Sequence, residues 1–295
     1  MRAVLVVAAA WVMGCRSTEA SATANGEAAA NGAATANGAA TASGASAAEW
    51  SCGAVHGEAR LARALGHGGR LVLGAIADSN GATTATMANL RRIGAAFAEA
   101  RVDAVVALGD LGKSEDEIAA VLEGIAASAR APVLALAGER ERENLFHAAV
   151  KRVHDKGVDV VDLVDTRLVD TGEIDIVSLP GYPFSRNGCH YVAADLEGAA
   201  RLSSGRGHAR VVVAHTPPKG HGAAAIDWAL GDVNAGDAAM AAIVERIAPV
   251  AALFAHVDEA GGRADGERIN VGSVERGMAA IVEIDGGRAT HRVLR

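Results

Sequence analysis

The clearest indication of the fold lies in residues 102–110, which read Val102-Asp103-Ala104-Val105-Val106-Ala107-Leu108-Gly109-Asp110. A short apolar run that stops at a glycine and a carboxylate is typical of a buried strand that ends in a polar loop. We therefore predict a strand over Val102–Leu108, with Gly109 and Asp110 in the loop that follows it.

Four other apolar runs repeat this pattern, each followed by polar residues. They are Leu71–Ala77 before Asp78-Ser79-Asn80, Pro132–Ala137 before Gly138-Glu139-Arg140-Glu141, Arg210–Ala214 before His215, and Val250–Ala255 before His256-Val257-Asp258. Further strands are predicted at Val158–Val164 and Ile174–Leu179. Because the carboxyl ends of parallel strands form the ligand-binding edge of open α/β sheets, we expect these polar side chains to meet there.

Helical patterns separate the strands. They predict helices over Thr84–Ala100, from Ser114 to about Arg130, up to about Lys156, and over Ala238–Ile247. Glu117 follows Ser114 by three residues, which is a capping-box signature. Strands that alternate with helices indicate an α/β fold. The predicted strands at the end of the chain, Ile269–Val271, Met278–Ile284 and Thr290–Leu294, suggest a second sheet or an antiparallel edge.

The order and spacing of these polar motifs resemble those of the calcineurin-like metallophosphoesterases. The family pattern is D-x-H, G-D, G-N-H-D/E, a lone H, and G-H-x-H. The text around the motifs is also similar, at residues 102–110, at His215-Thr216-Pro217-Pro218 and at Asn270-Val271-Gly272-Ser273. The resemblance covers roughly Arg70 to Ile284, and it implies a four-layered sandwich of two packed mixed sheets flanked by helices.

The resemblance also implies two divalent metal ions that share Asp110. One ion would take Asp78, Asn80, Asp110 and Asp258, and the other Asp110, Glu139, His215 and His256. Oxygen donors stand at three places where the family has His or Asn, which favours Mn or Mg over Zn. The metal could still be Mn, Mg, Fe or Zn, or the site could have lost its metal.

Arg140 stands where the family has its catalytic histidine. An arginine stays protonated near neutral pH, so it would bind the phosphoryl oxygens instead of acting as a general acid. We therefore expect Asp110 and Arg140 to carry the catalytic roles in metal-dependent hydrolysis of a phosphate mono- or diester. The alternative is an inactive phosphoesterase-like binding or scaffold protein, which the simultaneous departures at Asn80, Glu139, Arg140 and Asp258 favour.

A competing motif overlaps the second strand. Residues 107–114, Ala-Leu-Gly-Asp-Leu-Gly-Lys-Ser, nearly match a phosphate-binding loop between a strand and a helix. Its first glycine is replaced by Ala107, and Asp110 would repel phosphate. Lys113 and Ser114 are better explained as a loop residue and a helix cap.

The amino-terminal part has the features of an export signal. An apolar run, Ala3–Met13, ends at Gly14-Cys15, which resembles a bacterial lipobox and is too short to span a membrane. We expect a signal peptide at 1–14, lipid on Cys15, an Ala/Asn/Gly-rich tether at 15–48, and a phosphoesterase-like domain at 49–295. The protein would then be exported and attached to the bacterial cell envelope through this lipid.

Charge and cysteine content restrict the remaining possibilities. The chain carries 28 Lys and Arg and 35 Asp and Glu, which gives a net charge of −7. It has no basic stripe and few aromatic residues, so we expect no nucleic acid as its partner. The resemblance implies instead a phosphoester small molecule or a phosphorylated ligand. In an oxidising compartment Cys52 and Cys189 could form a disulfide, but the sequence does not exclude two free thiols.

Overall fold

The computed structural model describes residues 52, 59–184 and 188–295. The predicted signal peptide, Cys15 and the tether fall outside these described residues. Within the described part of the chain, no helix is both long and apolar enough to cross a membrane.

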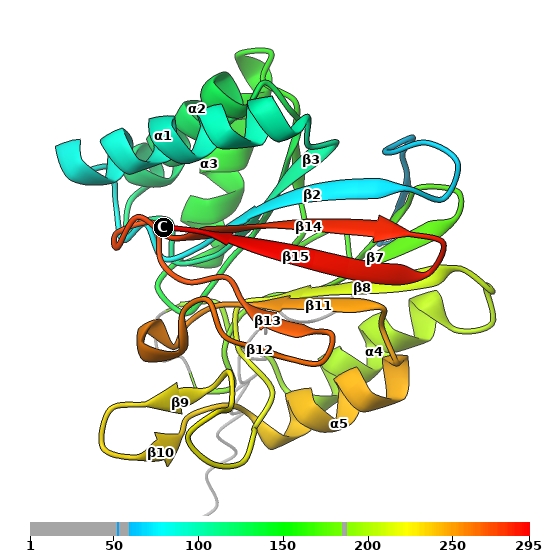
Figure 1. The fold of residues 1–295 in the computed structure, drawn as a ribbon. Coiled ribbons are helices and arrows are strands. Elements are labelled where there is room, and N and C mark those ends of the chain that lie inside the picture. The colour runs from blue at the N-terminus through cyan, green and yellow to red at the C-terminus, as the bar shows by residue number, and fades with distance from the viewer. Residues whose placement is uncertain (1–51, 53–58, 185–187) are drawn as a thin grey trace, which may run out of the picture. The chain divides into compact units, whose positions relative to one another are not determined.

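Two mixed sheets form the centre of the domain (Figure 1). The first has the order β15 (Arg288–Leu294), β14 (Ala279–Asp285), β2 (Leu71–Ile76), β3 (Ala104–Leu108), β4 (Val133–Leu136) and β5 (Val160–Asp162). The second has the order β1 (Arg60–Ala62), β6 (Leu168–Asp170), β7 (Ile174–Leu179), β8 (Ala209–Ala214), β11 (Ala251–Phe254), β13 (Arg268–Asn270) and β12 (Ala264–Asp265). Strands β2 to β5 are parallel to one another, as are β7, β8, β11 and β13.

Helices cover the outer faces of both sheets (Figure 1). The first sheet is covered by α1 (Thr84–Ala100), α2 (Glu115–Ala129) and α3 (Glu143–Asp155), and the second by α4 (Ala193–Ser203) and α5 (Ala238–Ile247). A short hairpin, β9 (Trp228–Ala229) and β10 (Val233–Asn234), and the 3₁₀ turn η1 (Asp258–Ala260) complete the described elements. The predicted four-layered sandwich is confirmed.

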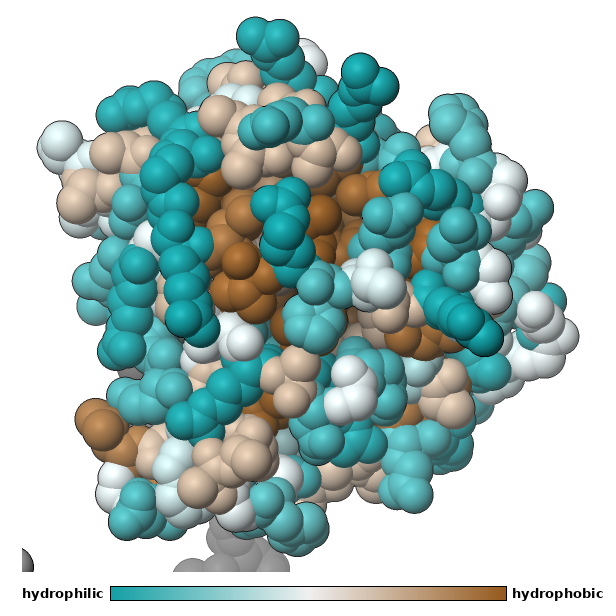
Figure 2. Space-filling view, viewed as in Figure 1, coloured by the Kyte–Doolittle hydropathy of each residue, from teal (hydrophilic) through white to brown (hydrophobic). Residues whose placement is uncertain are grey.

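Three apolar clusters hold the four layers together. One lies between the helices α1–α3 and the first sheet, a second between the two sheets, and a third between the second sheet and the helices α4 and α5. The cluster between the sheets consists mainly of Val, Leu, Ile and Ala, as the low aromatic content requires. The surface in Figure 2 is largely hydrophilic, and apolar side chains show mainly below α1, over β14 and β15.

Most predicted elements are present, with shifted ends. The helices Thr84–Ala100 and Ala238–Ile247 and the strand Ile174–Leu179 have the predicted bounds. The strand predicted over Val158–Val164 is only Val160–Asp162, because Asp162 accepts a hydrogen bond from the amide of Val164 and starts a turn. The antiparallel edge suggested for the end of the chain is the β14–β15 hairpin, while β13 joins the second sheet.

Two local predictions, the helix cap at Ser114 and the Cys52–Cys189 disulfide, can be checked against the structure. Ser114 caps α2 by accepting from the amide of Glu117, but the Glu117 carboxylate accepts from the amide of Lys113 instead of that of Ser114. Cys52 and Cys189 form a disulfide, with their Cα atoms 5.3 Å apart. The disulfide links the start of the domain to the loop after β7, and removes the alternative of two free thiols.

An ion pair between α3 and the edge strand β5 should make stability depend on pH. The His147 Nδ1 atom lies 2.6 Å from Asp162 Oδ2, and this hydrogen bond raises the pKa of His147 to about 9. The charged pair should contribute its full stability below about pH 6.5, the unfolded value, and lose it as the pH rises through about 9. His147→Gln should therefore reduce the free energy of unfolding more at about pH 6 than at about pH 9.5.

Chemical denaturation at several pH values measures this difference. His154→Gln is the matched control, because His154 lies on the same helix and is exposed to solvent. A cost of His147→Gln that is independent of pH would contradict the prediction.

Candidate metal centre

The polar residues that follow five strands lie at one edge of the two sheets, as predicted. Asp78 and Asn80 follow β2, Asp110 follows β3, and Glu139 and Arg140 follow β4. His215 follows β8, and His256 and Asp258 follow β11. Side chains from both sheets therefore converge, and the residue pairs Asp110–Arg140, His215–Glu139 and Asp78–His256 are in contact.

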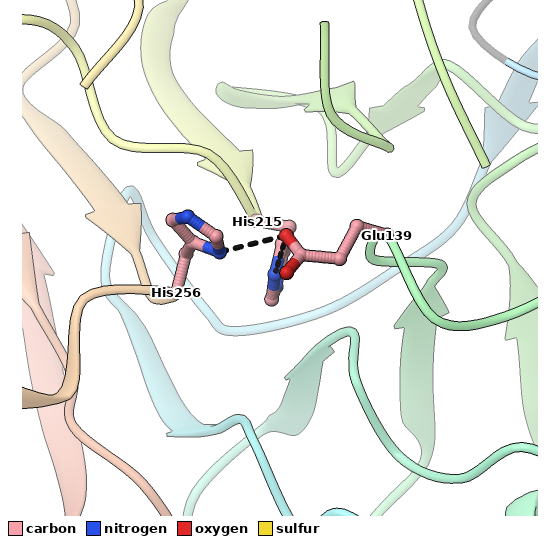
Figure 3. Close-up of side chains that lie close together, drawn as sticks. All are labelled: Glu139, His215 and His256. Carbon is pink, nitrogen blue, oxygen red and sulfur yellow. Dashed lines mark ion pairs between the residues drawn. The ribbon is translucent and has the colours of Figure 1, made fainter. Parts of the chain in front are cut away.

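Glu139, His215 and His256 form one group of possible metal ligands at this edge (Figure 3). Glu139 Oε2 lies 2.7 Å from His256 Nδ1 and 3.4 Å from His215 Nε2. Burial disfavours ionised Glu139, but the adjacent imidazoles of His215 and His256 hold the pKa of this carboxyl well below its usual range. Two imidazole nitrogens and one carboxylate oxygen within 4.8 Å of one another are a suitable donor set for a divalent transition metal.

His215 is held in the orientation that a metal ligand needs. It is fully buried, and its Nδ1 atom donates to the carbonyl of Leu108 at 2.8 Å. Its Nε2 atom is buried and lies near Glu139 without the geometry of a hydrogen bond. Burial acts against its protonated form, but Asp110 and Glu139 raise the pKa of His215 to about 10. A buried nitrogen of this kind, oriented through the other ring nitrogen, is the arrangement expected of a metal-binding histidine.

A second group shares His215 and contains Asp78 and Asp110. Both carboxylates are almost fully buried. Burial, together with the nearby carboxylates of Asp110 and Asp258, raises the pKa of Asp78 to about 8. Such closely spaced acidic groups need positive charge nearby to be stable when ionised.

Arg140 supplies part of this positive charge. Its Nε atom lies 3.1 Å from Asp110 Oδ2, and its Nη1 atom donates to Asn80 Oδ1 at 2.6 Å. The backbone amide of Arg140 donates to Asp110 Oδ1 at 3.1 Å. The guanidinium therefore contacts two of the four side chains that the resemblance assigns to one metal ion.

The other two side chains of that set are also engaged. Asp258 Oδ2 lies 3.3 Å from Arg276, and Asp78 Oδ2 accepts from the amide of His256. Asn80 also donates its side-chain amide to Glu275 at 2.8 Å. The described residues therefore fit a cation at Glu139, His215 and His256. At the other set, Asp78 and Asp110 remain within ligand distance of His215, while Arg140 already contacts Asp110 and Asn80.

Several residues at this edge have a left-handed backbone. Asp78, Asn80, Asp110 and His256 have φ angles of 50°, 54°, 54° and 68°, in the left-handed region. Other non-glycine residues with positive φ, such as Arg101, Arg130 and Ala248, end helices. Left-handed residues cost free energy and persist where the surrounding structure over-determines them, which is common at functional sites.

Glu141 is important to the site, although the sequence pattern assigned it no role. Its carboxylate is fully buried and accepts hydrogen bonds from the amides of Asp110, Leu111 and Gly112 in the loop after β3, and from that of Gly138 in the loop after β4. Burial, together with the charge of Asp110, raises the pKa of Glu141 to about 7. Because these loop amides point at Glu141, the segment 107–114 does not form a phosphate-binding loop.

The same two loops approach each other very closely. Gly109 has a φ of 87°, and a Cβ atom placed there would lie 2.3 Å from the nitrogen of Gly138. A Cβ atom on Gly138 would lie 2.4 Å from Asp110 Oδ1. Neither position can accept a side chain without moving the backbone that carries Asp110.

Tyr182 is a second residue that the sequence analysis missed. Its ring packs against that of His256, with centroids 4.6 Å apart, and against Phe184, which is 82% exposed. Tyr182 follows β7 after Pro180 and Gly181, so the rule that selected the other strand ends would also have selected it. These two rings form an aromatic rim beside His256.

The comparisons support the fold. The sequence matches no protein-family model and no curated protein. In structure, the chain is similar to TT1561 of Thermus thermophilus, with 14% identity, a TM-score of 0.59, and coverage of 76% of this chain and 99% of that one. It is also similar to a dimetal phosphatase from Danio rerio, with 14% identity, a TM-score of 0.53, and coverage of 76% and 95%. The chain has the metallophosphoesterase fold.

The buried Glu141 carboxylate should contribute strongly to stability. In Glu141→Gln, an NH₂ group replaces one oxygen and leaves two backbone amides without an acceptor. We expect a loss of roughly 2–6 kcal/mol in the free energy of unfolding, from about 1–3 kcal/mol for each buried group left unpaired. Glu117→Gln is the control, because the Glu117 carboxylate also accepts a backbone amide but near the surface.

Urea denaturation measures both variants. Glu117→Gln should lose less than about 1 kcal/mol. Equal stabilities of Glu141→Gln and the parent protein would contradict the proposed role of the buried carboxylate.

Proposed function

We propose that this protein hydrolyses a phosphate mono- or diester in a reaction that depends on a divalent metal. The observation that carries the proposal is the convergence of Glu139 Oε2, His215 Nε2 and His256 Nδ1, at the sheet edge of a metallophosphoesterase fold. These three residues would hold the ion. A bound divalent ion would supply positive charge to the phosphate and lower the pKa of a water molecule.

Arg140 would bind and orient the phosphate. A guanidinium has five N–H donors, and the contacts to Asp110 and Asn80 use its Nε and Nη1 atoms. Its remaining N–H groups are available for phosphoryl oxygens, to which arginine binds with two parallel hydrogen bonds. Asp110, on the other side, would fix the guanidinium in place as a positioning residue.

The location of the protein is a separate part of the proposal. We propose that it is exported and attached to the cell envelope through lipid on Cys15, which lies outside the described residues. The Cys52–Cys189 disulfide supports export, because structural disulfides persist in oxidising compartments and are rare in the cytosol.

A binding protein without activity is the second candidate. The observation in its favour is the position of Arg140. Its guanidinium contacts Asp110 Oδ2 and Asn80 Oδ1, two oxygen atoms that a second metal would need as ligands. In that case the same arginine would hold a phosphorylated ligand and no bond would be broken.

Metal content and hydrolysis together test the proposal. The full chain, purified without chelator and supplied with Mn²⁺ or Zn²⁺, should contain about one metal ion per chain by elemental analysis. It should hydrolyse p-nitrophenyl phosphate or bis(p-nitrophenyl) phosphate. His256→Ala should weaken metal binding by about 100-fold or more and abolish hydrolysis, whereas His154→Ala, on the exposed side of α3, should change neither.

The outcomes separate the two candidates. Metal binding without hydrolysis of either ester would contradict the hydrolase and support the binding protein. A parent protein that takes up no metal would contradict metal dependence.

The absence of a proton donor at position 140 leads to a further prediction. Without general-acid assistance, hydrolysis of esters with poor leaving groups should be about 10²–10⁴-fold slower than hydrolysis with such assistance. The ratio of kcat/KM for p-nitrophenyl phosphate to kcat/KM for glycerol phosphate should therefore be large, and Arg140→His should reduce it. An unchanged ratio in Arg140→His would show that leaving-group protonation does not involve this position.

A further inference from the structure

A cationic pocket adjoins the candidate metal centre. It has a volume of about 540 Å³ and is lined by Lys113, Glu139, Arg140, Arg142 and Leu145, among others. Glu139 and Arg140 therefore belong both to the metal centre and to the wall of this pocket. A ligand whose phosphate lies at the centre would have its next few atoms within reach of Lys113 and Arg142.

The charge of this pocket is unusual for this protein. The whole chain has a net charge of −7, yet three cationic side chains and one carboxylate line the pocket. Glu139 is also the carboxylate that pairs with His215 and His256, so its charge is already engaged inside the candidate metal centre, with or without a metal. The remaining lining charges are all positive.

Lys113 and Arg142 are cations without acidic partners. Among the described residues, neither forms an ion pair, and both are exposed. Farther along α3, by contrast, Arg152 pairs with Glu115 and Asp116, and Lys156 pairs with Glu123. Those cations are neutralised, whereas Arg142 at the start of α3 and Lys113 before α2 are available.

Local structure holds both cations at the pocket. The Lys113 amide donates to Glu117 at 2.9 Å, which fixes the loop between β3 and α2. Arg142 is the N-cap residue of α3 and makes no side-chain capping hydrogen bond. The positive end of this helix dipole therefore adds to the positive charge of the pocket.

The volume indicates what kind of ligand fits. Small-molecule sites typically enclose roughly 300–1,000 Å³, so this pocket has room for more than a single phosphate ion. Its cations suit phosphate or carboxylate oxygens, and Leu145 supplies one apolar contact.

We infer that the substrate is a small phosphoester with a second anionic group, a phosphate or a carboxylate, which Lys113 and Arg142 bind while the first phosphate lies at Arg140 and the candidate metal centre. This inference rests on the proposed function for the first phosphate. The binding of the second group depends only on the pocket, so it can be tested without metal.

Calorimetric titration of the full chain in excess chelator is the direct test. Orthophosphate, pyrophosphate and tripolyphosphate are the probes, because they add phosphate groups stepwise. Pyrophosphate or tripolyphosphate should bind the parent protein about tenfold or more tightly than orthophosphate does. In the double variant Lys113→Met/Arg142→Met this advantage should disappear, while orthophosphate binding stays the same.

Two control variants make the result specific. Lys113→Arg/Arg142→Lys keeps both charges and should keep most of the advantage. Arg292→Met removes a cation from β15, at the opposite edge of the first sheet, and should have no effect. Thermal unfolding of each variant shows whether it remains folded.

The outcomes distinguish the two proposals. If the longer phosphates bind the parent and the double variant equally, the inference is wrong, whatever the hydrolysis assays show. If their binding depends on Lys113 and Arg142 but the metal-loaded parent hydrolyses no phosphoester, the binding of the second anionic group is supported and the proposed hydrolase activity is wrong. A carboxylate as the second group would be indicated if 4-carboxyphenyl phosphate outcompetes phenyl phosphate in the parent but not in the double variant.

Discussion

The Glu141 carboxylate, buried under four backbone amides, holds together the two loops on which the candidate site is built. One loop carries Asp110 and the other carries Glu139 and Arg140, and Glu141 accepts hydrogen bonds from both. Its own carbonyl accepts from the amide of Cys189, which the disulfide ties to Cys52. The positions of Asp110 and Arg140 therefore depend on a residue whose side chain is fully buried.

Charge balance explains much of the remaining arrangement. Asp78, Asp110, Glu139 and Glu141 bring four carboxyl groups to one edge of the sheets. In the described chain, Arg140 contacts Asp110, and the two histidines contact Glu139. The guanidinium of Arg140 keeps its positive charge whether or not a metal is bound. Unlike a metal ion, however, it cannot lower the pKa of a water molecule to make it a nucleophile. Arg140 thus supplies positive charge beside Asp110 and Asn80 that does not depend on a bound ion.

Much of this structure could be predicted from the sequence, because it depends on local patterns. Apolar runs that end in polar residues located the strands β2, β3, β4, β8 and β11 and the edge where Asp78, Asp110, Glu139, His215 and His256 meet. The sequence could not predict that Arg140 would turn to Asp110 and Asn80, because side-chain direction depends on three-dimensional neighbours. Nor could it predict β1, β6 or α4. The two strands have only three residues each, and β1 pairs with a segment far along the chain, while α4 has a weak apolar pattern and no side-chain cap at Val192.

The contact between Gly109 and Gly138 affects how such sequences should be recognised. Both glycines are required by the space between two loops, whether or not any bond is broken at the site. A side chain at either glycine would force the two loops apart, whatever residues stand at the ligand positions beside them. The glycines of the G-D and G-E motifs therefore report how the two loops pack. The chemistry of the site depends on the side chains that these loops carry, such as Arg140.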